Sequence, residues 1–549
     1  MTKPTRPIRS AFRYFLVRFA VVCSFCVLAA RLVYVQGFIA SNLEQKVKQQ
    51  LLHAVDPGRP RAPIVDSRRV PLAESVQVHS CFVDPKEVKS KRDTAQTLAS
   101  LLNMNEASLY RRMRQAKGRF MWVKRNVPID VVNKIKAKKI AGVAFRSEYR
   151  RHYPQGDIAS HLLGLVGVDG HGLSGIEQKF DGSLMPGERF FKSGSGGFPD
   201  GTVQLTIDAG MQKIAERELD WGAKKCNARR GTVIIQEPAT GKILALAAWP
   251  PMSLNPHDPS ALEKIRVPPL SDAFEPGSTF KIVIAAAALE ENLAQPHEIF
   301  YGENGSWKVS TIKIRDHEPR GRMTFEEIFI FSSNIGSAKI AERVGSERLY
   351  QYARLFGFGT YPGSGLSGET KGVLRHPTQW SAISKHVVSF GQEIAVTALQ
   401  LVNAYSCVAN EGVLMEPRIV QAVLSEDGQT VWEASPQKVR RVISEKTARA
   451  LKDILTKAVD RGTGQNAQVR WNTDCLVAGK TGTAQKFDTV LKRYRMDLSL
   501  VSFCGFFPAD KPKMTMLVIL DDLQGRRWGG TDAAPIFRRI AEQISSKYI

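Results

Sequence analysis

The stretch FEPGSTFKIVIAAAALEE, residues 274–291, carries the strongest pattern in this sequence. Glu275-Pro276-Gly277 is typical of a helix start, and the apolar run behind it predicts a buried helix over Thr279–Leu289. Ser278 and Lys281 are one helical turn apart, so the lysine amine can reach the serine hydroxyl and take its proton. The positive end of the same helix faces the oxyanion that forms when the serine attacks a carbonyl group. The stretch therefore predicts a serine nucleophile with a lysine base at a helix N-terminus.

A serine and a lysine at this spacing are a weak signal by themselves. The sequence contains two further pairs of this kind, Ser310/Lys313 and Ser435/Lys438. Pro436 directly follows Ser435, and Ser310 lies in a stretch without the apolar spacing of a helix. The helix-start context therefore favours Ser278 over the other two serines.

Two further elements follow Ser278 in order along the chain. Ser332-Ser333-Asn334 is expected in a loop, and Lys480-Thr481-Gly482-Thr483 follows the apolar Leu476-Val477-Ala478, as expected for a strand. Each element is common by itself. The ordered triple Ser-x-x-Lys, Ser-x-Asn and Lys-Thr-Gly is the combination found in penicillin-binding proteins and β-lactamases, in which the serine is the nucleophile.

Beyond this triple, the sequence resembles the class B penicillin-binding proteins over nearly its whole length. The segments that carry the resemblance are Arg31–Gln36, GRPRAPIVDSRRVPLA (58–73), RHYP (151–154), SHLLG (160–164), GLSGIEQKFD (172–181), FEPGSTFK (274–281), SSNIG (332–336), SFGQEIAVTALQ (389–400) and GKTGTAQK (479–486). Arg61-Ala62-Pro63 departs from the family's usual glycine-containing form. The SSN and KTGTAQ forms of the motifs, with GGTDAAPIF (529–537), resemble the division-specific branch of the family.

The resemblance implies an α/β multidomain chain. The expected parts are a cytoplasmic tail (1–13), a single transmembrane helix that serves as a signal anchor (14–36), an elongated α+β pedestal of the penicillin-binding protein dimerisation type (37–200), and a C-terminal serine transpeptidase or β-lactamase-like domain (201–549). In the last of these, a central antiparallel sheet is expected to be flanked by helices.

The residues of the C-terminal part predict several elements of that sheet directly. Gly231–Gln236 and Lys242–Ala248 are apolar runs around a turn and predict a β-hairpin. Met514–Leu520 predicts a further strand. Ala534–Ile544 predicts a closing helix, because its apolar residues recur at helical spacing.

The N-terminal segment indicates the compartment. Residues 1–18 contain five basic residues and no acidic one, and Phe19–Ala30 is uncharged. This run is shorter than the roughly 20 residues that a bilayer requires, but Arg18 and Arg31 can extend their charges to the interface, so Tyr14–Val35 can serve as the span. The run does not end in a good signal-peptidase site, which favours an uncleaved anchor over a cleaved signal peptide. Because the basic side stays in the cytoplasm, nearly all of the chain is expected outside.

The charge of the chain narrows its partners. Its 549 residues include 77 Lys and Arg against 53 Asp and Glu, a net charge of +24, which suggests an anionic neighbour. An extracytoplasmic location excludes nucleic acid as the main partner. Residues 86–152 hold 18 basic and 5 acidic residues and apolar positions at helical spacing. We predict a small helical subdomain with a solvated basic face there, in preference to a surface that docks against anionic wall polymer or lipid.

Cysteines and other metal-ligating residues give no sign of a cofactor. Two of the seven cysteines lie in the apolar N-terminal run, and the other five are scattered with no CxxC pair and no zinc spacing. Buried small hydrophobic side chains are the simplest interpretation of those five cysteines. No metal or organic cofactor is expected.

Chemistry and the resemblance together suggest roles for the motif residues. The expected catalytic residues are Ser278, Lys281, Ser332 and Lys480, and the expected substrate-binding residues are Asn334, Thr481, Gly482 and Thr483. Ser278 is expected to be acylated, with Lys281 as its base, kept neutral by desolvation and by the positive Lys480. Ser332 is expected to relay the proton to the leaving amine.

The remaining motif residues are expected to hold the substrate. The resemblance implies that Asn334 holds the stem-peptide amide and that Thr483 meets the terminal carboxylate of D-Ala-D-Ala. Lys480 and Thr481 are expected to tune Ser332 electrostatically. The backbone N–H groups of Ser278 and Thr483 are expected to form the oxyanion hole.

The function implied is that of a peptidoglycan D,D-transpeptidase, which cross-links stem peptides during septal cell-wall synthesis and is acylated by penicillin. The implied partners are D-Ala-D-Ala stem peptides, β-lactams, a membrane glycosyltransferase of the shape, elongation, division and sporulation family, and other divisome proteins. The implied location is the cytoplasmic (inner) membrane at the division septum, with a single-pass anchor and most of the chain in the periplasm.

Two alternatives stay open. The first is hydrolysis, as in a D,D-carboxypeptidase or a β-lactamase, which needs a carboxylate to activate water. Glu369 is the candidate for that carboxylate, but its glycine-rich surroundings predict a surface loop. The second alternative is a non-catalytic divisome scaffold or β-lactam sensor, which would not need the catalytic residues together.

Overall fold

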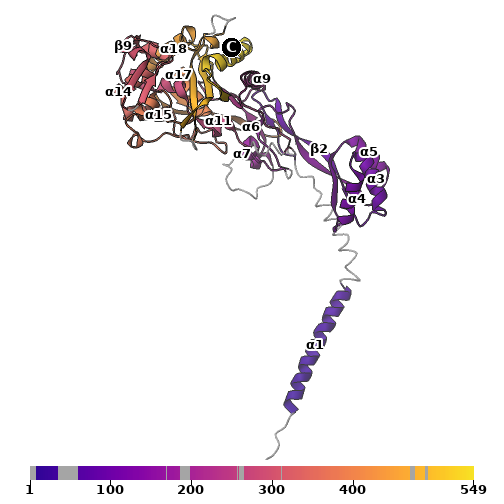
Figure 1. Cartoon of the computed structure of the whole chain (residues 1–549). Helices are drawn as coiled ribbons and strands as arrows, with labels where there is room; N and C mark the ends of the chain where they lie inside the picture. Colours follow the sequence, from indigo (N-terminus) through magenta and orange to yellow (C-terminus); the bar gives the residue numbers. More distant parts are fainter. Residues whose placement is uncertain are drawn as a thin grey trace, which may run out of the picture. The chain divides into compact units, whose positions relative to one another are not determined.

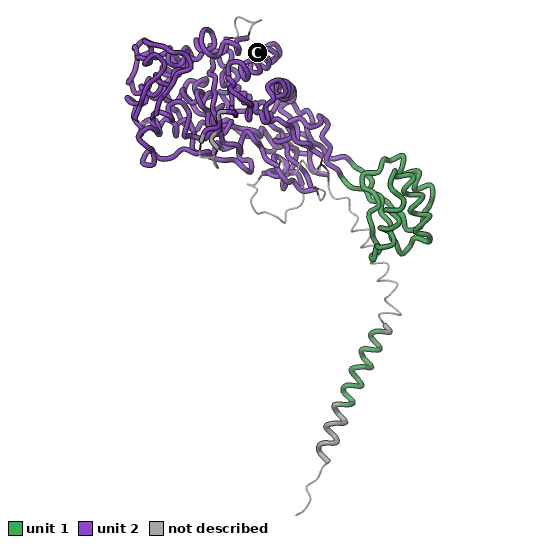
Figure 2. The backbone as a smooth tube through the Cα atoms, in the orientation of Figure 1, with its two compact units in different colours: residues 1–59, 77–149 green, residues 60–76, 150–549 purple. Residues whose placement is uncertain are grey.

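The computed structural model describes residues 8–34, 60–167, 170–185, 198–255, 258, 265–310, 312–469, 476–488 and 493–548. The chain forms two compact units, which Figure 2 shows in different colours. Unit 1 comprises residues 1–59 and 77–149, and unit 2 comprises residues 60–76 and 150–549. Helix α1 covers Ile8–Tyr34 at the N-terminus. In the described part of the chain, no helix combines the length and the apolar character that crossing a membrane requires.

Unit 1 contains the basic stretch and has both helices and strands. Its elements are β2 (Pro71–Val83, from residue 77), α3 (Lys91–Leu102), α4 (Glu106–Gln115), β3 (Met121–Val127), α5 (Ile129–Ala137) and β4 (Val143–His152, to residue 149). Strand β2 pairs with β3 and β4, and the three labelled helices gather in this unit in Figure 1.

The buried residues of unit 1 confirm the predicted helices of the basic stretch, but this unit also contains strands that were not predicted. Each of the three helices turns an apolar face to this core, and the fully buried residues include Leu98 of α3, Leu109 of α4 and Val132 of α5. The predicted helical spacing is therefore confirmed. The strands were missed because β3 and β4 are rich in charged residues and have no clean alternation of apolar and polar positions. Arg111 and Arg114 on α4 are exposed, as expected for a solvated basic face.

Unit 2 begins with a small mixed sheet. Strand β1 (Ile64–Val65) pairs in parallel with β5 (Thr202–Leu205) and antiparallel with the first residues of β2. Strand β15 (Val420–Leu424) joins β5 to β16 (Thr430–Glu433). Chain segments far apart in sequence thus meet in one sheet.

A buried ionic cluster lies beside this sheet. Glu177 is fully buried and accepts hydrogen bonds from Nε of Arg61 at 2.6 Å and from Nε of Arg151 at 2.7 Å. Nη1 of Arg61 also contacts Asp181 at 2.5 Å. All four residues belong to segments quoted above for the family resemblance, and the fold gives a physical reason: a charge buried at this depth needs a partner from another segment.

The larger part of unit 2 is built on a five-stranded antiparallel sheet with the order β18-β19-β20-β6-β7. Its strands are β6 (Arg230–Gln236), β7 (Ile243–Trp249), β18 (Ala478–Asp488), β19 (Arg493–Phe507) and β20 (Met514–Gln524). The predicted hairpin is β6–β7, and the predicted strand over Met514–Leu520 lies within β20, so both predictions are confirmed.

Helices cover both faces of this sheet, because successive residues of its strands alternate between two apolar cores. In β6, Val233 and Ile235 face one core and Ile234 faces the other. The first core is closed by α9 (Ala209–Cys226) and by the C-terminal α20 (Ala534–Tyr548), which lie side by side (Figure 1). The predicted closing helix is therefore confirmed.

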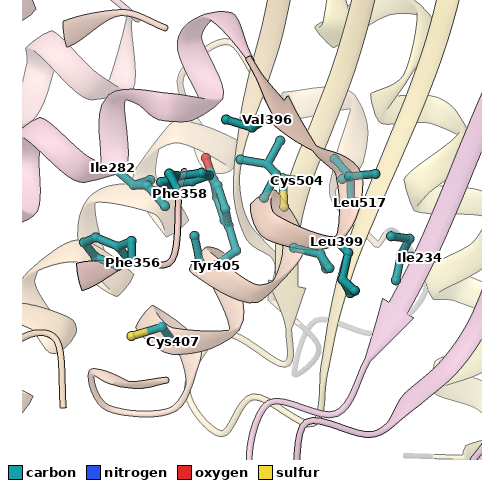
Figure 3. Packing of buried hydrophobic residues seen from close by; sticks show 14 of the residues in the cluster. Ile234, Ile282, Phe356, Phe358, Val396, Leu399, Tyr405, Cys407, Cys504 and Leu517 are labelled. Carbon is teal, nitrogen blue, oxygen red and sulfur yellow. The ribbon is translucent and has the colours of Figure 1, made fainter. Parts of the chain in front are cut away.

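The opposite face packs against α17 (Ala398–Ala409), and α12 (Lys281–Glu290) lies farther from the sheet in the same apolar core. Figure 3 shows Tyr405 and Leu399 of α17 between Ile282 of α12 and the sheet residues Ile234 and Leu517. This helical layer fixes α12, which carries Lys281, against the sheet that carries Lys480.

The remaining elements of unit 2 surround this layered core. They are α6 (Ser160–Leu163), α7 (Gly175–Lys179), α8 (Asp181–Leu184), α11 (Pro268–Ser271), β8 (Ala273–Phe274), η2 (Gly277–Phe280), β9 (Ile299–Tyr301), η3 (Glu303–Gly305), β10 (Ser306–Val309), β11 (Ile312–Arg315), β12 (Arg322–Thr324), α13 (Phe325–Ile330), α14 (Asn334–Val344), α15 (Ser346–Leu355), η4 (Pro377–Gln379), α16 (Ser384–Ser389), β13 (Val396–Thr397), β14 (Val413–Met415), β17 (Lys438–Arg441), α18 (Glu445–Asp460), η5 (Gln465–Ala467) and α19 (Gly529–Asp532).

Candidate active site

Ser278 lies on a short 3₁₀ turn, η2, that continues directly into α12. The helix predicted over Thr279–Leu289 is present, with its first turn wound as 3₁₀. Gly277 has a φ of +56°, and a Cβ atom there would lie 2.6 Å from the carbonyl oxygen of Thr483. Glycine is therefore required for this turn to approach the Lys-Thr-Gly strand so closely. The N–H of Gly277 donates to the carbonyl of Gly391 at 3.0 Å, which ties the turn to the SFGQ segment.

Lys281 is buried, with only 1% of its surface exposed. Its Nζ donates to the carbonyl oxygen of Ser332 at 2.7 Å and to Oδ1 of Asn334 at 2.8 Å, and it lies 3.3 Å from Oγ of Ser332. The structure thus brings the first two motifs together. The hydroxyl of Ser278 makes no hydrogen bond with any described residue, so it is not engaged by Lys281 in this arrangement.

Ser332 itself has an unusual backbone. Its φ is +62°, in the left-handed region that costs a residue other than glycine on the order of 1–3 kcal/mol. The bond from Nζ of Lys281 to its carbonyl oxygen helps to hold this conformation. Ser333 follows as the N-cap of α14, with its Oγ accepting the N–H of Gly336 at 2.8 Å. Ser332 and Ser333 lie in the predicted loop, whereas Asn334 is the first residue of α14.

Lys480 extends from β18 and is also 1% exposed. Its Nζ contacts Oγ1 of Thr463 at 3.2 Å and Oγ1 of Thr481 at 3.4 Å, and these two hydroxyls are 2.8 Å apart. No hydrogen bond among the described residues joins Lys480 to Ser332, the residue that it is expected to tune electrostatically. Thr463, which follows α18, was not predicted from the sequence.

Burial shifts the pKa of both lysines, and the charge of Lys480 also acts on Lys281. Burial and then the nearby Lys480 hold the pKa of Lys281 well below its ordinary range. Burial lowers the pKa of Lys480 to about 7. A neutral Lys281 has two N–H groups for its two carbonyl-type acceptors and keeps a lone pair for a hydroxyl proton, which is the state that a general base requires.

The third motif forms the edge of the site next to the nucleophile turn. A Cβ atom at Gly482 would lie 2.3 Å from Oγ of Ser502 and 3.0 Å from the carbonyl of Pro276, so this position also requires glycine. Oγ1 of Thr483 accepts the N–H of Gly529, from the GGTDAAPIF segment, at 3.3 Å. Three of the predicted substrate-binding residues, Thr481, Gly482 and Thr483, therefore lie on β18, which is in close contact with η2, whereas Asn334 is the first residue of α14.

The residues that the sequence offers for alternative roles, two other serines and one glutamate, lie elsewhere in the fold. Ser310 lies in the turn between β10 and β11, and Ser435 lies in the segment between β16 and β17, so neither begins a helix. The carboxylate of Glu369 accepts N–H groups of Gly363 and Ser364, at 3.3 and 3.0 Å, within its own loop. These contacts give Glu369 a local structural role.

Two further side chains that sequence reasoning missed support the site. Tyr405 is fully buried and its hydroxyl donates to the carbonyl of Thr279 at 2.9 Å, directly behind the nucleophile turn. Asp316 accepts hydrogen bonds at the start of α14. Nothing in their local sequence indicates these contacts. Among the described residues, no group of His, Cys, Asp or Glu could hold a metal ion, and the six described cysteines are free thiols.

Comparison with known proteins agrees with this geometry. The family model of the penicillin binding protein transpeptidase domain matches residues 231–542, and that of the penicillin-binding protein dimerisation domain matches residues 58–188. The chain is 33% identical to stage V sporulation protein D of Bacillus subtilis, over 96% of this chain and 84% of that protein. It is 29% identical to peptidoglycan D,D-transpeptidase FtsI of Escherichia coli, over 95% and 90%.

A solved structure shows the same architecture. Penicillin binding protein 3 of Mycobacterium tuberculosis, complexed with aztreonam, superposes with a TM-score of 0.70 at 27% identity, covering 89% of this chain and 96% of that chain. The two domain models together account for most of both units, and the residues that the transpeptidase model matches include all three motifs of the candidate site. The chain therefore belongs to the class B penicillin-binding proteins and joins their dimerisation domain to a serine transpeptidase domain.

Proposed function

We propose that this protein is a peptidoglycan D,D-transpeptidase of the division septum, which works through an acyl-enzyme on Ser278. The observation that carries the proposal is the position of Lys281. Its Nζ contacts both Ser332 and Asn334 and extends from the helix that directly follows Ser278, so the proposed base and proton relay meet at a buried point one helical turn from the proposed nucleophile. Such a cluster has a use in acyl transfer, and a scaffold would not need it.

In the proposed acylation, Oγ of Ser278 attacks the carbonyl carbon of the penultimate D-Ala. Its proton passes to the neutral Nζ of Lys281, and the negative charge on the carbonyl oxygen is stabilised by the N–H groups of Ser278 and Thr483. The C–N bond to the terminal D-Ala then breaks. Ser332 gives its hydroxyl proton to the leaving amine and receives one from Lys281, so D-Ala leaves as a neutral amine and the base is restored.

In the proposed second step, the amine of another stem peptide attacks the ester on Ser278. Lys281 takes a proton from the attacking amine and passes it to Oγ of Ser278 as the ester C–O bond breaks, and a new amide joins the two stem peptides. Asn334 and Thr483 are proposed to hold the stem-peptide amide and the terminal carboxylate of the donor. Lys480 and Thr481 are proposed to tune Ser332 and Lys281 by charge and hydrogen bonding.

The relatives support the substrate class. FtsI of Escherichia coli is named a peptidoglycan D,D-transpeptidase, and two structures of the Mycobacterium tuberculosis protein hold aztreonam and ampicillin. Because a β-lactam ring presents a strained amide to the same serine, we propose that Ser278 is acylated by β-lactams. The division-type motif forms favour septal over elongation synthesis.

The proposed location is the cytoplasmic membrane, with residues 1–13 in the cytoplasm, residues 14–36 as a single-pass anchor, and a pedestal (37–200) and transpeptidase domain (201–549) outside. The basic residues before the apolar run support this orientation. The proposed partners are a glycosyltransferase of the shape, elongation, division and sporulation family, which would supply glycan strands, and other divisome proteins. Reporter fusions at the C-terminus should be active only outside the cytoplasm; a released soluble form beginning near Arg31 would contradict the anchor.

The central test is covalent labelling of the detergent-purified full chain with fluorescent penicillin. Ser278→Ala should abolish the labelled band and the penicilloyl mass adduct. Ser310→Ala and Ser435→Ala are matched controls, because each removes a serine with the same spacing to a lysine, and both should label as the wild type does. A mass adduct on Ser278→Ala would refute the assignment.

A further inference from the structure

Asp316 follows strand β11 and reaches the start of α14 with both of its carboxylate oxygens. Oδ1 accepts the backbone N–H of Asn334 at 2.6 Å and that of Ile335 at 3.0 Å. Oδ2 accepts the hydroxyl proton of Ser333 at 2.6 Å. One carboxylate therefore binds donors from three successive residues, which include the second and third residues of the Ser-x-Asn motif.

These contacts determine how the hydroxyl of Ser333 is used. A hydroxyl has one proton, and the bond to Asp316 takes it. The lone pairs of Oγ are then directed to the N–H of Gly336, which Oγ accepts at 2.8 Å as the N-cap of α14. A charged acceptor at a helix N-terminus is bound more strongly than a neutral one, both through shorter hydrogen bonds and through the helix dipole.

The same end of β11 also orients the side chain of Asn334. Its Nδ2 donates to the carbonyl of Arg315 at 3.1 Å, which directs Oδ1 to Nζ of Lys281 at 2.8 Å. Ser332 precedes these anchored residues and holds its left-handed backbone with its carbonyl on the same Nζ, at 2.7 Å. The three acceptors around Lys281 thus depend on a loop that Asp316 fixes.

We infer that Asp316 is a positioning residue for acylation: it holds the Ser332 and Asn334 acceptors in place around Lys281 and supplies the negative charge that faces the ammonium formed by proton transfer. The inference rests on the proposed function, in which Ser278 is acylated and Lys281 is its base. The charged groups that influence Lys281 are Lys480 and Asp316. Burial and Lys480 lower the pKa of Lys281, whereas the carboxylate of Asp316 raises it.

If Asp316 were only a helix cap, it would stabilise α14 without affecting acylation. A variant that removes its charge distinguishes this structural role from the proposed positioning role. Asp316→Asn keeps an oxygen for the two backbone N–H groups but loses the negative charge and the acceptor for Ser333. Because that charge favours the protonated form of Lys281, its loss should lower the pKa of Lys281. The acidic limb of the acylation rate against pH should then move to lower pH.

The experiment measures the second-order acylation rate of the full chain with fluorescent penicillin between about pH 5 and pH 9. At the plateau, Asp316→Asn should fall about 10-fold and Asp316→Ala about 100-fold, because misplacement of a catalytic group by about 1 Å can cost 100-fold. The acidic limb of Asp316→Asn should lie at lower pH than that of the wild type.

The matched control is Asp208→Asn, which removes the charge of another helix-capping aspartate. Asp208 accepts the N–H of Met211 at 2.9 Å and the hydroxyl of Tyr548 at 3.0 Å, at the start of α9 on the other face of the sheet. This variant should lower the melting temperature and leave both the acylation rate and its pH limb unchanged.

Two results would overturn the inference. One is an Asp316→Asn rate within about twofold of the wild type at every pH, which is below the loss expected from misplacement. The other is a reduced rate with an unmoved acidic limb, which is the behaviour of a structural cap. Labelling of Ser278→Ala would refute the proposed function instead. That failure is recognised in a different variant, so the two failures are distinguishable.

Discussion

Replacing Lys480 with methionine should stabilise the protein while it removes activity. Lys480 is buried with 1% of its surface exposed, and its charge is held by two threonine hydroxyls and no carboxylate among the described residues. Methionine has a similar length, fits an apolar gap, and needs no hydrogen bond. The site therefore keeps a buried cation that costs stability and that function requires.

The magnitude follows from the pKa of the buried amine. Burial lowers the pKa of Lys480 from 10.5 to about 7, so the unfolded chain binds this proton more tightly than the folded chain does. At about 1.4 kcal/mol for each factor of ten in proton affinity, the folded state loses about 4 kcal/mol at pH 7. The two hydrogen bonds to Thr463 and Thr481 return about 1 kcal/mol each. We therefore expect Lys480→Met to gain about 2 kcal/mol in the free energy of unfolding, taking these contributions together.

The sign of the pH dependence is also determined. Below about pH 7 the folded protein carries the charged amine and bears the full cost. Between about pH 7 and 10.5 only the unfolded chain holds this proton, and the cost falls steadily as the pH rises toward 10.5. The gain of Lys480→Met should therefore be largest at and below neutral pH and should shrink toward pH 10. A gain of about 2 kcal/mol corresponds to roughly 2 °C in melting temperature, because a unit of this size unfolds with an entropy of roughly 0.9 kcal/mol/K.

The assay is thermal unfolding of the full chain in detergent at several pH values, followed by intrinsic fluorescence, with penicillin acylation measured in parallel. Lys486→Met is the matched control, because Lys486 lies on the same strand but is partly exposed and ion-paired with Asp522 at 2.6 Å and Asp521 at 3.1 Å. It should lose stability. Lys480→Met should also lose at least about 100-fold in acylation rate, because burial keeps Lys281 neutral with the help of the Lys480 charge, and that charge is gone.

The reasoning would be refuted if Lys480→Met lowered the melting temperature at pH 7 by as much as Lys486→Met does. An increase that persisted unchanged to pH 10 would contradict its electrostatic origin, because methionine packing alone does not depend on pH.

Two further outcomes are expected. Glu177→Ala leaves two buried guanidinium groups without their carboxylate, so it should cost about 3–5 kcal/mol of unfolding free energy in chemical denaturation. Acylation by the protein that remains folded should be unchanged. A loss of unfolding free energy below about 1 kcal/mol would contradict an essential buried ion pair. Glu369→Gln should leave the lifetime of the penicilloyl adduct unchanged in mass spectra taken over time, because Glu369 binds only its own loop among the described residues. If the wild-type adduct disappeared within seconds and persisted in the Gln variant, the protein would be a hydrolase.

Patterns within a short stretch predicted much of unit 2. The apolar runs of β6, β7 and β20 were recognised because each strand buries both faces and therefore has few polar positions. The helix after Ser278 was recognised from its start signal and its apolar run. In unit 1 the helices were predicted and the strands were not, since charge on β3 and β4 hides the alternation of their pairing faces.

The sequence by itself determined which serine, which lysines and which loop belong to the candidate site, because these residues occur in local motifs whose spacing one helical turn or one strand imposes. Only the tertiary structure decided that Nζ of Lys281 contacts Ser332 and Asn334, that Thr463 faces Lys480, and that Asp316 holds the start of α14. Each of these contacts joins elements that are separated in sequence and brought together by packing around the central sheet. A hydrogen bond of this kind depends on a side chain's distance and direction, and no local spacing specifies either.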